Sequence, residues 1–211
     1  MELFNYFRSS ASWRVRIALA LKGLDYDYRP VHLVRNEHQL PGYAGHALNA
    51  LVPLLRLDEG QALHQSLAII EYLDEAHPQP PLLPADALAR GRVRAMALDV
   101  ACEIHPLNNL RVLRYLTGPL GLDEAAKMRW IHHWIEDGLA VVERQIAAWG
   151  QGFCFGETPT LADCVLVPQV FNAQRFGCKL DHLPGVMAVH ARCMALPAFA
   201  RTAPDQCPDA E

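Results

Sequence analysis

One proline-rich stretch divides the chain into two parts with different patterns. Residues 77–86 contain four prolines. Neither a helix interior nor a central strand tolerates such a run, so the sequence predicts an extended connector there. Before it, strand and helix patterns alternate; after it, only helical periodicity remains. We therefore expect a small α/β domain over residues 1–80, a linker over 81–87 and an all-helical domain over 88–211.

The α/β part contains predicted strands and helices in alternation. Its first strand–helix–strand unit fits a parallel pair joined by a crossover, and the short gap between its last two strands fits a hairpin. The strands are expected at 2–6, 27–32, 54–57 and 62–64, and the helices at 11–22 and 66–76. In the second part, helices are expected at 88–116 (bent near His105-Pro106), 123–149, 160–174, 185–194 and 198–202.

Composition excludes several classes of function. The formal net charge is −4 and no basic stripe is present, which argues against a nucleic-acid or anionic-membrane partner. The sequence has no apolar run of membrane length and no signal-peptide pattern, so we expect a cytoplasmic protein. The six cysteines are scattered, which favours free thiols, and the ten histidines show no metal-ligand spacing. No metal is implied.

A cluster of hydroxyls at the first predicted helix is the strongest functional signal. Ser9, Ser10 and Ser12 gather at its start, and Arg8 stands directly before them. A helix N-terminus offers unpaired N–H groups and the positive end of the dipole, so it holds anions and lowers the pKa of a thiol placed there. A plain N-cap would explain one hydroxyl. It would not explain the cluster with its arginine.

Two further segments offer polar or backbone groups in the same half. Val52 precedes Pro53 and is therefore extended, which leaves its main chain available for pairing. Ser66 is expected to cap the next helix, with the Gln65 amide beside it, and this second N-terminus would suit a carboxylate. Taken alone, the first also fits an ordinary strand entry and the second an ordinary cap.

The helical half contains one structural motif and several candidate ligands. Thr160 and Asp163 form a predicted capping box, which assigns Asp163 to folding and not to acid catalysis. His105 and Arg111 are expected on neighbouring faces of one helix, where they could line a cavity or lie on a solvated face. Arg175 ends a helix, where it could complement the dipole or bind a ligand.

Together these blocks resemble the zeta class of glutathione transferases. The resemblance rests on Phe7–Leu19, Val52-Pro53, His64–Leu73, the capping box and Asn172–Phe176, whose order and spacing match across almost the whole chain. The segment His105–Asn109 is similar to that of bacterial maleylacetoacetate and maleylpyruvate isomerases. The resemblance implies a thioredoxin-like N-terminal domain, an all-α C-terminal domain and a homodimer.

It also implies roles for the candidate residues. Glutathione would be the cofactor, with Ser9, helped by Ser10, at its sulfur, although Ser12 stays an alternative. Pro53 would be cis, and Val52 would pair with the cysteinyl part. Gln65 and Ser66 would hold the γ-glutamyl carboxylate, and His38 or a neighbour the glycine end. Arg8, Arg175, Arg111 and His105 are the candidates for binding a dicarboxylate substrate, since arginine forks match carboxylates.

The implied reaction is the cis–trans isomerisation of maleylacetoacetate, with glutathione regenerated. Maleylpyruvate stays open as the substrate, as does a general conjugating or α-haloacid-dehalogenating transferase, and a non-catalytic interaction module is the remaining alternative. The family motif usually has a cysteine where this chain has Ala11, so catalysis cannot depend on a protein thiol there. The resemblance leaves open whether Asp99 or Glu103 of the partner subunit contacts glutathione.

Overall fold

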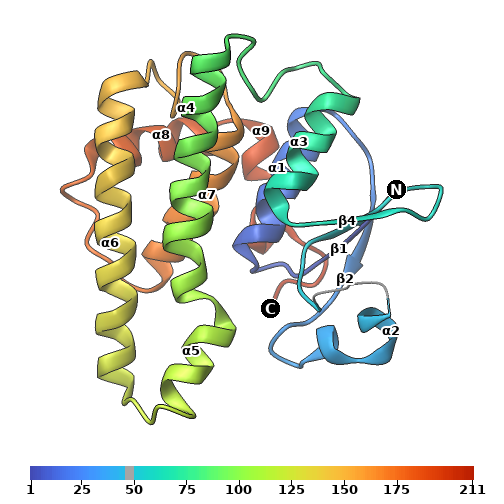
Figure 1. The fold of residues 1–211 in the computed structure, drawn as a ribbon, viewed down its shortest axis with the longest axis vertical. Helices are drawn as coiled ribbons and strands as arrows, with labels where there is room; N and C mark the ends of the chain where they lie inside the picture. The colour runs from blue at the N-terminus through green and yellow to red at the C-terminus, as the bar shows by residue number, and fades with distance from the viewer. Residues whose placement is uncertain (46–49) are drawn as a thin grey trace. The chain divides into compact units, whose positions relative to one another are not determined.

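The computed structural model describes residues 1–45 and 50–211, which form two compact units (Figure 1). The first unit contains Met1–Leu82 together with Ala195–Glu211, and the second contains Leu83–Met194. The first unit is α/β and the second is helical, as the sequence predicts.

A four-stranded sheet with the order β2-β1-β3-β4 forms the centre of the first unit. β1 pairs with β2 in parallel and with β3 antiparallel, and β3 pairs antiparallel with β4, so both the crossover and the hairpin are confirmed. The strands are β1 (Glu2–Asn5), β2 (Asp27–Pro30), β3 (Leu54–Arg56) and β4 (Ala62–His64). The helical elements are α1 (Ser10–Leu21), η1 (Glu37–Gln39), α2 (Pro41–Ala44) and α3 (Ser66–Ala76).

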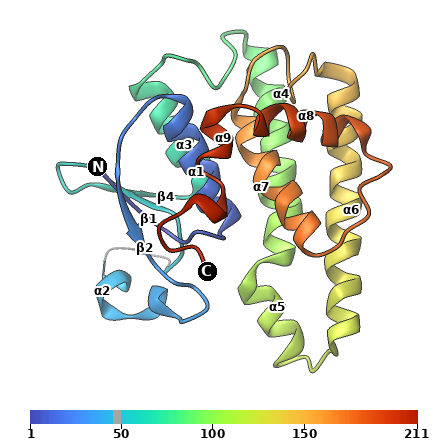
Figure 2. The ribbon, with the colours of Figure 1, turned by 180° about the vertical axis from the view of Figure 1, so that it is seen from behind.

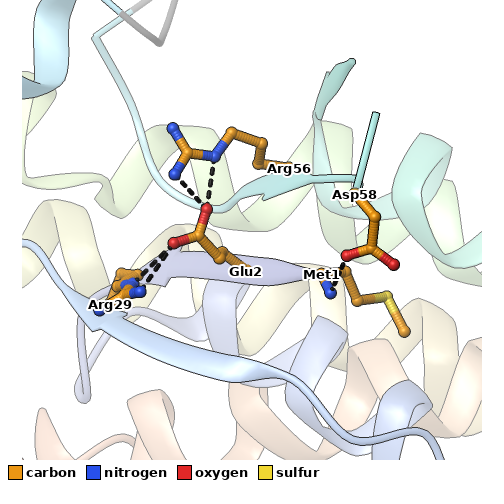
Figure 3. A network of polar contacts seen from close by, with 5 residues as sticks. All are labelled: Met1, Glu2, Arg29, Arg56 and Asp58. Carbon is orange, nitrogen blue, oxygen red and sulfur yellow. Dashed lines mark hydrogen bonds and ion pairs between the residues drawn. The ribbon is translucent and has the colours of Figure 1, made fainter. Parts of the chain in front are cut away.

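One carboxylate on β1 links this strand to both of its neighbours, β2 and β3 (Figure 3). Glu2 on β1 accepts from Arg29 of β2 at 2.9 Å and also pairs with Arg56 of β3. These arginines hold the pKa of Glu2 below its ordinary value, Arg56 making the larger contribution. The ion pairs link neighbouring strands on one face of the sheet.

Helices α1 and α3 pack side by side, and α1 is buried along most of its length (Figure 1). Its apolar residues, such as Ile17 and Leu19, join a core with Leu3 and Leu55 of the sheet. Lys22, just past α1, is buried and donates to Asp74 at 2.8 Å and to the carbonyls of His77 and Pro80. This contact fastens the start of the proline-rich connector to the first unit.

The second unit departs from its prediction in one place. The helix expected over 88–116 is interrupted, because a π-helical turn and a 3-10 turn at His105-Pro106 separate its two ends. Gly138 lies against this interruption, where a Cβ would collide with Ile104. The elements are α4 (Ala87–Leu98), η2 (Asp99–Ile104), η3 (His105–Asn108), α5 (Leu110–Thr117), α6 (Glu124–Trp149), α7 (Leu161–Arg175) and α8 (Pro184–Met194).

The C-terminal segment corrects the predicted domain boundary. Residues 195–211 were expected in the helical domain, but they pack in the first unit, where α9 (Pro197–Ala200) lies against α1 (Figure 2). Thr202 explains why, since it accepts a bond from the Trp13 indole and its carbonyl accepts one from Arg16, each at 3.1 Å. The short η4 (Pro204–Gln206) follows.

All six cysteines are free thiols, as predicted, and four of them are buried. Among the described residues, no helix has both the length and the apolar character needed to cross a membrane.

Candidate active site

The N-terminus of α1 is an open helix start. Ser9 is the N-cap: its backbone is extended, and its Oγ accepts from the Ser12 N–H at 3.2 Å. No acidic side chain occupies the first turn. Because the first turn contains no carboxylate of its own, the positive end of this dipole suits an anion or a thiolate from outside.

The three hydroxyls differ in accessibility. Ser10 and Ser12 are buried, whereas Ser9 is only half-buried and Arg8 is exposed. The Arg8 guanidinium lies over the rings of Tyr6 and Phe7, at 5.9 and 5.6 Å from their centroids. Ser9 therefore caps the helix and is also the most accessible hydroxyl of the cluster.

The loop before β3 has the geometry that the resemblance implies. The Val52–Pro53 peptide bond is cis, and both residues are buried. No residue that the structure describes forms a hydrogen bond with the Val52 main chain. Val52 shares an apolar cluster with Phe7, so this loop packs against the turn that leads into α1.

The N-terminus of α3 corrects one detail of the prediction. Ser66 is the first helical residue and not the cap; Gln65 takes the cap position, exposed and with a positive φ of 70°. The Ser66 Oγ accepts from Arg14 of α1 at 3.3 Å. Arg14 is only 2% exposed, so a buried cation lies behind this second helix start.

Contacts between side chains join these segments into one constellation. The Arg14–Ser66 bond links the two helix starts, and the apolar cluster links the Phe7 turn to Val52. His38 lies half-buried in η1, which packs against α2. In turn, Tyr43 of α2 donates to the Leu51 carbonyl at 2.5 Å, next to Val52.

Three buried or partly buried charged residues of this region were not singled out as functional from the sequence. Arg14 and Arg16 are buried in α1. Their position within an apolar stretch of the predicted helix is the sequence signal that could have identified them. Asp209 accepts from the Phe7 N–H at 3.2 Å. Nothing in the sequence around Asp209 indicates a contact with a residue so distant along the chain.

Comparison with known proteins assigns the family. Family models of the glutathione S-transferase N-terminal and C-terminal domains match residues 8–76 and 135–195. A solved maleylpyruvate isomerase, described as a bacterial glutathione transferase of the zeta class, is 48% identical, with a TM-score of 0.97 and full coverage of both chains. This chain belongs to the zeta class of glutathione transferases.

Two more relatives are maleylacetoacetate isomerases. The maleylacetoacetate isomerase of Pseudomonas aeruginosa is 50% identical over 99% of this chain and 98% of its own. The solved maleylacetoacetate isomerase of Anaeromyxobacter dehalogenans, which has glutathione bound in its active site, is 41% identical. It aligns with a TM-score of 0.90, covering 100% of this chain and 97% of that one.

In the helical unit of this zeta-class chain, the candidate ligands lie on three separate elements. His105 is half-buried in η3, Arg111 is exposed in the first turn of α5, and Arg175 is exposed at the end of α7. The prediction that His105 and Arg111 share neighbouring faces of one helix was wrong, because the extended Asn109 ends η3 and begins α5. The Arg175 guanidinium lies 4.2 Å from the centroid of the Phe176 ring.

The start of α7 confirms the structural reading of Asp163. Its carboxylate is fully buried and accepts from the N–H groups of Thr160 and Cys154, both at 2.8 Å. Burial raises the pKa of Asp163, and these hydrogen bonds oppose the shift. No group of three potential metal ligands occurs in the described part of the chain.

Proposed function

We propose that this protein is a glutathione-dependent cis–trans isomerase that converts maleylacetoacetate to fumarylacetoacetate. The observation that carries the proposal is the open N-terminus of α1, with the accessible Ser9 at its cap and no acidic side chain in its first turn. Such a site favours a thiolate over a thiol. The family membership supplies the reaction class.

The residues of the first unit fit glutathione. The Val52 main chain, beside the cis proline, is suited to pair with the cysteinyl part. Gln65 and Ser66, backed by the buried Arg14, would receive the γ-glutamyl carboxylate, since a helix N-terminus and a cation both favour an anion. His38 would serve the glycine end. When bound, glutathione supplies a thiolate that adds reversibly to the cis double bond, which permits rotation.

Ser9 would donate a hydrogen bond to the sulfur and stabilise the anion, with the helix dipole behind it. Ser10 and Ser12 are buried, so they would act by supporting the turn. Ala11 excludes a protein thiol from that position, so the reactive sulfur belongs to the cofactor.

Arginines would anchor the two carboxylates of the substrate. Arg8 and Arg175 are the first candidates, followed by Arg111, and His105 would bind a carboxylate or enolate oxygen. Arg175→Ala should raise the KM for the keto acid by about tenfold and leave the KM for glutathione nearly unchanged, because one fixed charge-assisted bond is lost. An equal rise in both KM values would count against this role.

The proposed assembly rests on the family resemblance, and the proposed location rests on the sequence pattern. We propose a homodimer in the cytoplasm, with no nucleic-acid or membrane partner. Sedimentation of the purified protein tests the dimer.

A second substrate has specific support. The solved relative with the TM-score of 0.97 is a maleylpyruvate isomerase, so maleylpyruvate is the alternative. The deciding experiment follows the isomerisation of both keto acids by absorbance, with and without glutathione, while free thiol is titrated. Turnover that needs glutathione at a constant thiol titre establishes the isomerase, and the ratio of kcat/KM values names the substrate. Loss of thiol with an electrophile would instead indicate a conjugating transferase.

A further inference from the structure

Phe7 leads into the candidate active site, and both its main-chain N–H and its carbonyl are held by hydrogen bonds with side chains. Phe7 lies two residues before Ser9, and its N–H donates to Asp209 Oδ2 at 3.2 Å. Its carbonyl accepts from Arg16 Nη2 at 2.8 Å. The Phe7 ring is buried in an apolar cluster that also contains Val52 and Cys207. The C-terminal segment therefore contributes both a hydrogen bond and packing at this residue.

Arg16, which holds the Phe7 carbonyl, is itself fixed by further hydrogen bonds. It is 1% exposed, and besides Phe7 it donates to Asn5 Oδ1 at 2.8 Å and to the Thr202 carbonyl at 3.1 Å. A guanidinium with several donors engaged in a rigid fork holds its partners in one geometry. Arg16 thus joins β1, the turn before α1 and the C-terminal segment.

Asp209 is itself oriented by a second partner. Its Oδ1 accepts a hydrogen bond from the Tyr28 hydroxyl of β2, while Oδ2 faces Phe7. Burial, together with this bond, raises the pKa of Tyr28, so the hydroxyl remains a donor throughout the neutral range. The carboxylate is therefore locked between a strand of the sheet and the turn.

We propose that Asp209 is a positioning residue for Ser9, acting through the main chain of Phe7. The inference rests on the role proposed above for Ser9 at the glutathione sulfur. The Phe7 peptide is fixed between Asp209 and Arg16, and the Ser9 N–H donates to the Tyr6 carbonyl at 3.0 Å. The direction of the Ser9 hydroxyl therefore depends on Asp209, which lies 202 positions from Phe7 in the sequence.

The first test needs no ligand. In Asp209→Ala, the amide hydrogens of Phe7, Ser9 and Ser12 should exchange faster in ¹⁵N NMR, because the turn loses one of its two polar anchors. Glu211→Ala is the matched control on the same segment: Glu211 pairs with Arg35 and lies 3.4 Å from His32, so those three amides should exchange as in the wild type. Wild-type exchange at Ser9 and Ser12 in Asp209→Ala would overturn the proposal.

The second test reads the chemistry. With glutathione bound, the ultraviolet absorbance of the thiolate gives the pKa of the cofactor thiol. Asp209→Ala should raise that pKa and lower kcat about tenfold at neutral pH with little change in the KM for glutathione, because small displacements of a catalytic group are costly. Asp209→Asn, which keeps an acceptor for the Phe7 N–H, should recover most of the rate.

The outcomes separate this inference from the proposed function. If wild-type protein binds glutathione but isomerises neither keto acid, the proposed reaction fails while the thiol titration still decides the role of Asp209. If the Ser9 amide loosens in Asp209→Ala but the thiol pKa and kcat stay at wild-type values, Asp209 serves only the fold and the inference is wrong. If wild-type protein binds no glutathione, the proposed function fails, and amide exchange decides whether Asp209 holds the turn.

Discussion

Helices α1 and α7 begin with the same kind of residue, but only the N-terminus of α7 is balanced by an acidic side chain in its first turn. Each has a hydroxyl residue at its N-cap: Ser9 for α1 and Thr160 for α7. At the third helical position α7 has Asp163, whose buried carboxylate accepts the N–H groups around it. α1 has Ser12 at that position and no acid in its first turn. One helix start is closed by its own chain, and the other is open to an external anion.

This difference distinguishes an N-cap that only stabilises its helix from an N-cap that leaves the helix start available to a ligand. The N-cap hydroxyl alone does not decide, because both helices have one. The deciding position is the one three residues after the cap. In α7 the carboxylate at that position accepts hydrogen bonds from the N–H groups of Thr160 and Cys154 and balances the positive end of the helix dipole. Exchanging these positions, or removing the hydroxyls, should therefore separate stability from chemistry.

The largest effect is expected at the closed helix start. Asp163→Ser gives α7 the residue that α1 has, and leaves the N–H groups of Thr160 and Cys154 buried without their acceptor. Urea unfolding should show a loss of about 3 kcal/mol, since each unsatisfied buried donor costs about 1–3 kcal/mol. The exposed Asp181→Ser is the control and should change stability little. Wild-type stability of Asp163→Ser would break the comparison.

The next effect concerns the hydroxyls. Ser9→Ala should lower kcat at least about tenfold and raise the pKa of the bound glutathione thiol, as expected when a positioned donor is removed. Thr160→Ala is the matched control, because both variants lose a cap interaction and about 1 kcal/mol of stability. Only the first should change the thiol titration. A near-wild-type rate in Ser9→Ala would indicate that Ser10 or Ser12, and not Ser9, donates the hydrogen bond to the glutathione sulfur.

The smallest effect is expected from closing the open helix start. Ser12→Asp copies the position of Asp163 into α1 and adds a negative charge to the helix start that would stabilise the thiolate. Glutathione affinity should fall by about tenfold at low ionic strength, since a charge at a helix N-terminus contributes up to about 2 kcal/mol. Ser12→Asn has nearly the same size without the charge. Equal losses in both variants, measured by calorimetry, would show that bulk and not charge is responsible.

Local patterns predicted most of the elements. The strands β1 and β4, the helix α3 and the box at Thr160 were found because alternation and capping residues act over short distances. The bounds of α3 were predicted correctly, but its N-cap was expected at Ser66 and is Gln65, because Gln65 adopts a positive φ that its residue type does not signal. The interruption at His105 was expected as a bend only, since proline marks the place but not the extent.

The candidate site was predicted where its residues lie in recognisable blocks. Its support was not predicted, because Asp209 and Thr202 contact the site from the far end of the chain. Single-sequence patterns contain no information about such pairs. The same reason explains why residues 195–211 were assigned to the helical half.

The placement of those last residues makes the helical unit an insertion within the α/β unit. During synthesis, the sheet and α1 emerge early, but Thr202 and Asp209 emerge after the whole helical unit. Contacts between distant segments form slowly, because a long loop must close first. The α/β unit therefore acquires the contacts of Thr202 and Asp209 only after the helical unit has been synthesised, and the turn at Ser9 lacks these anchors until then.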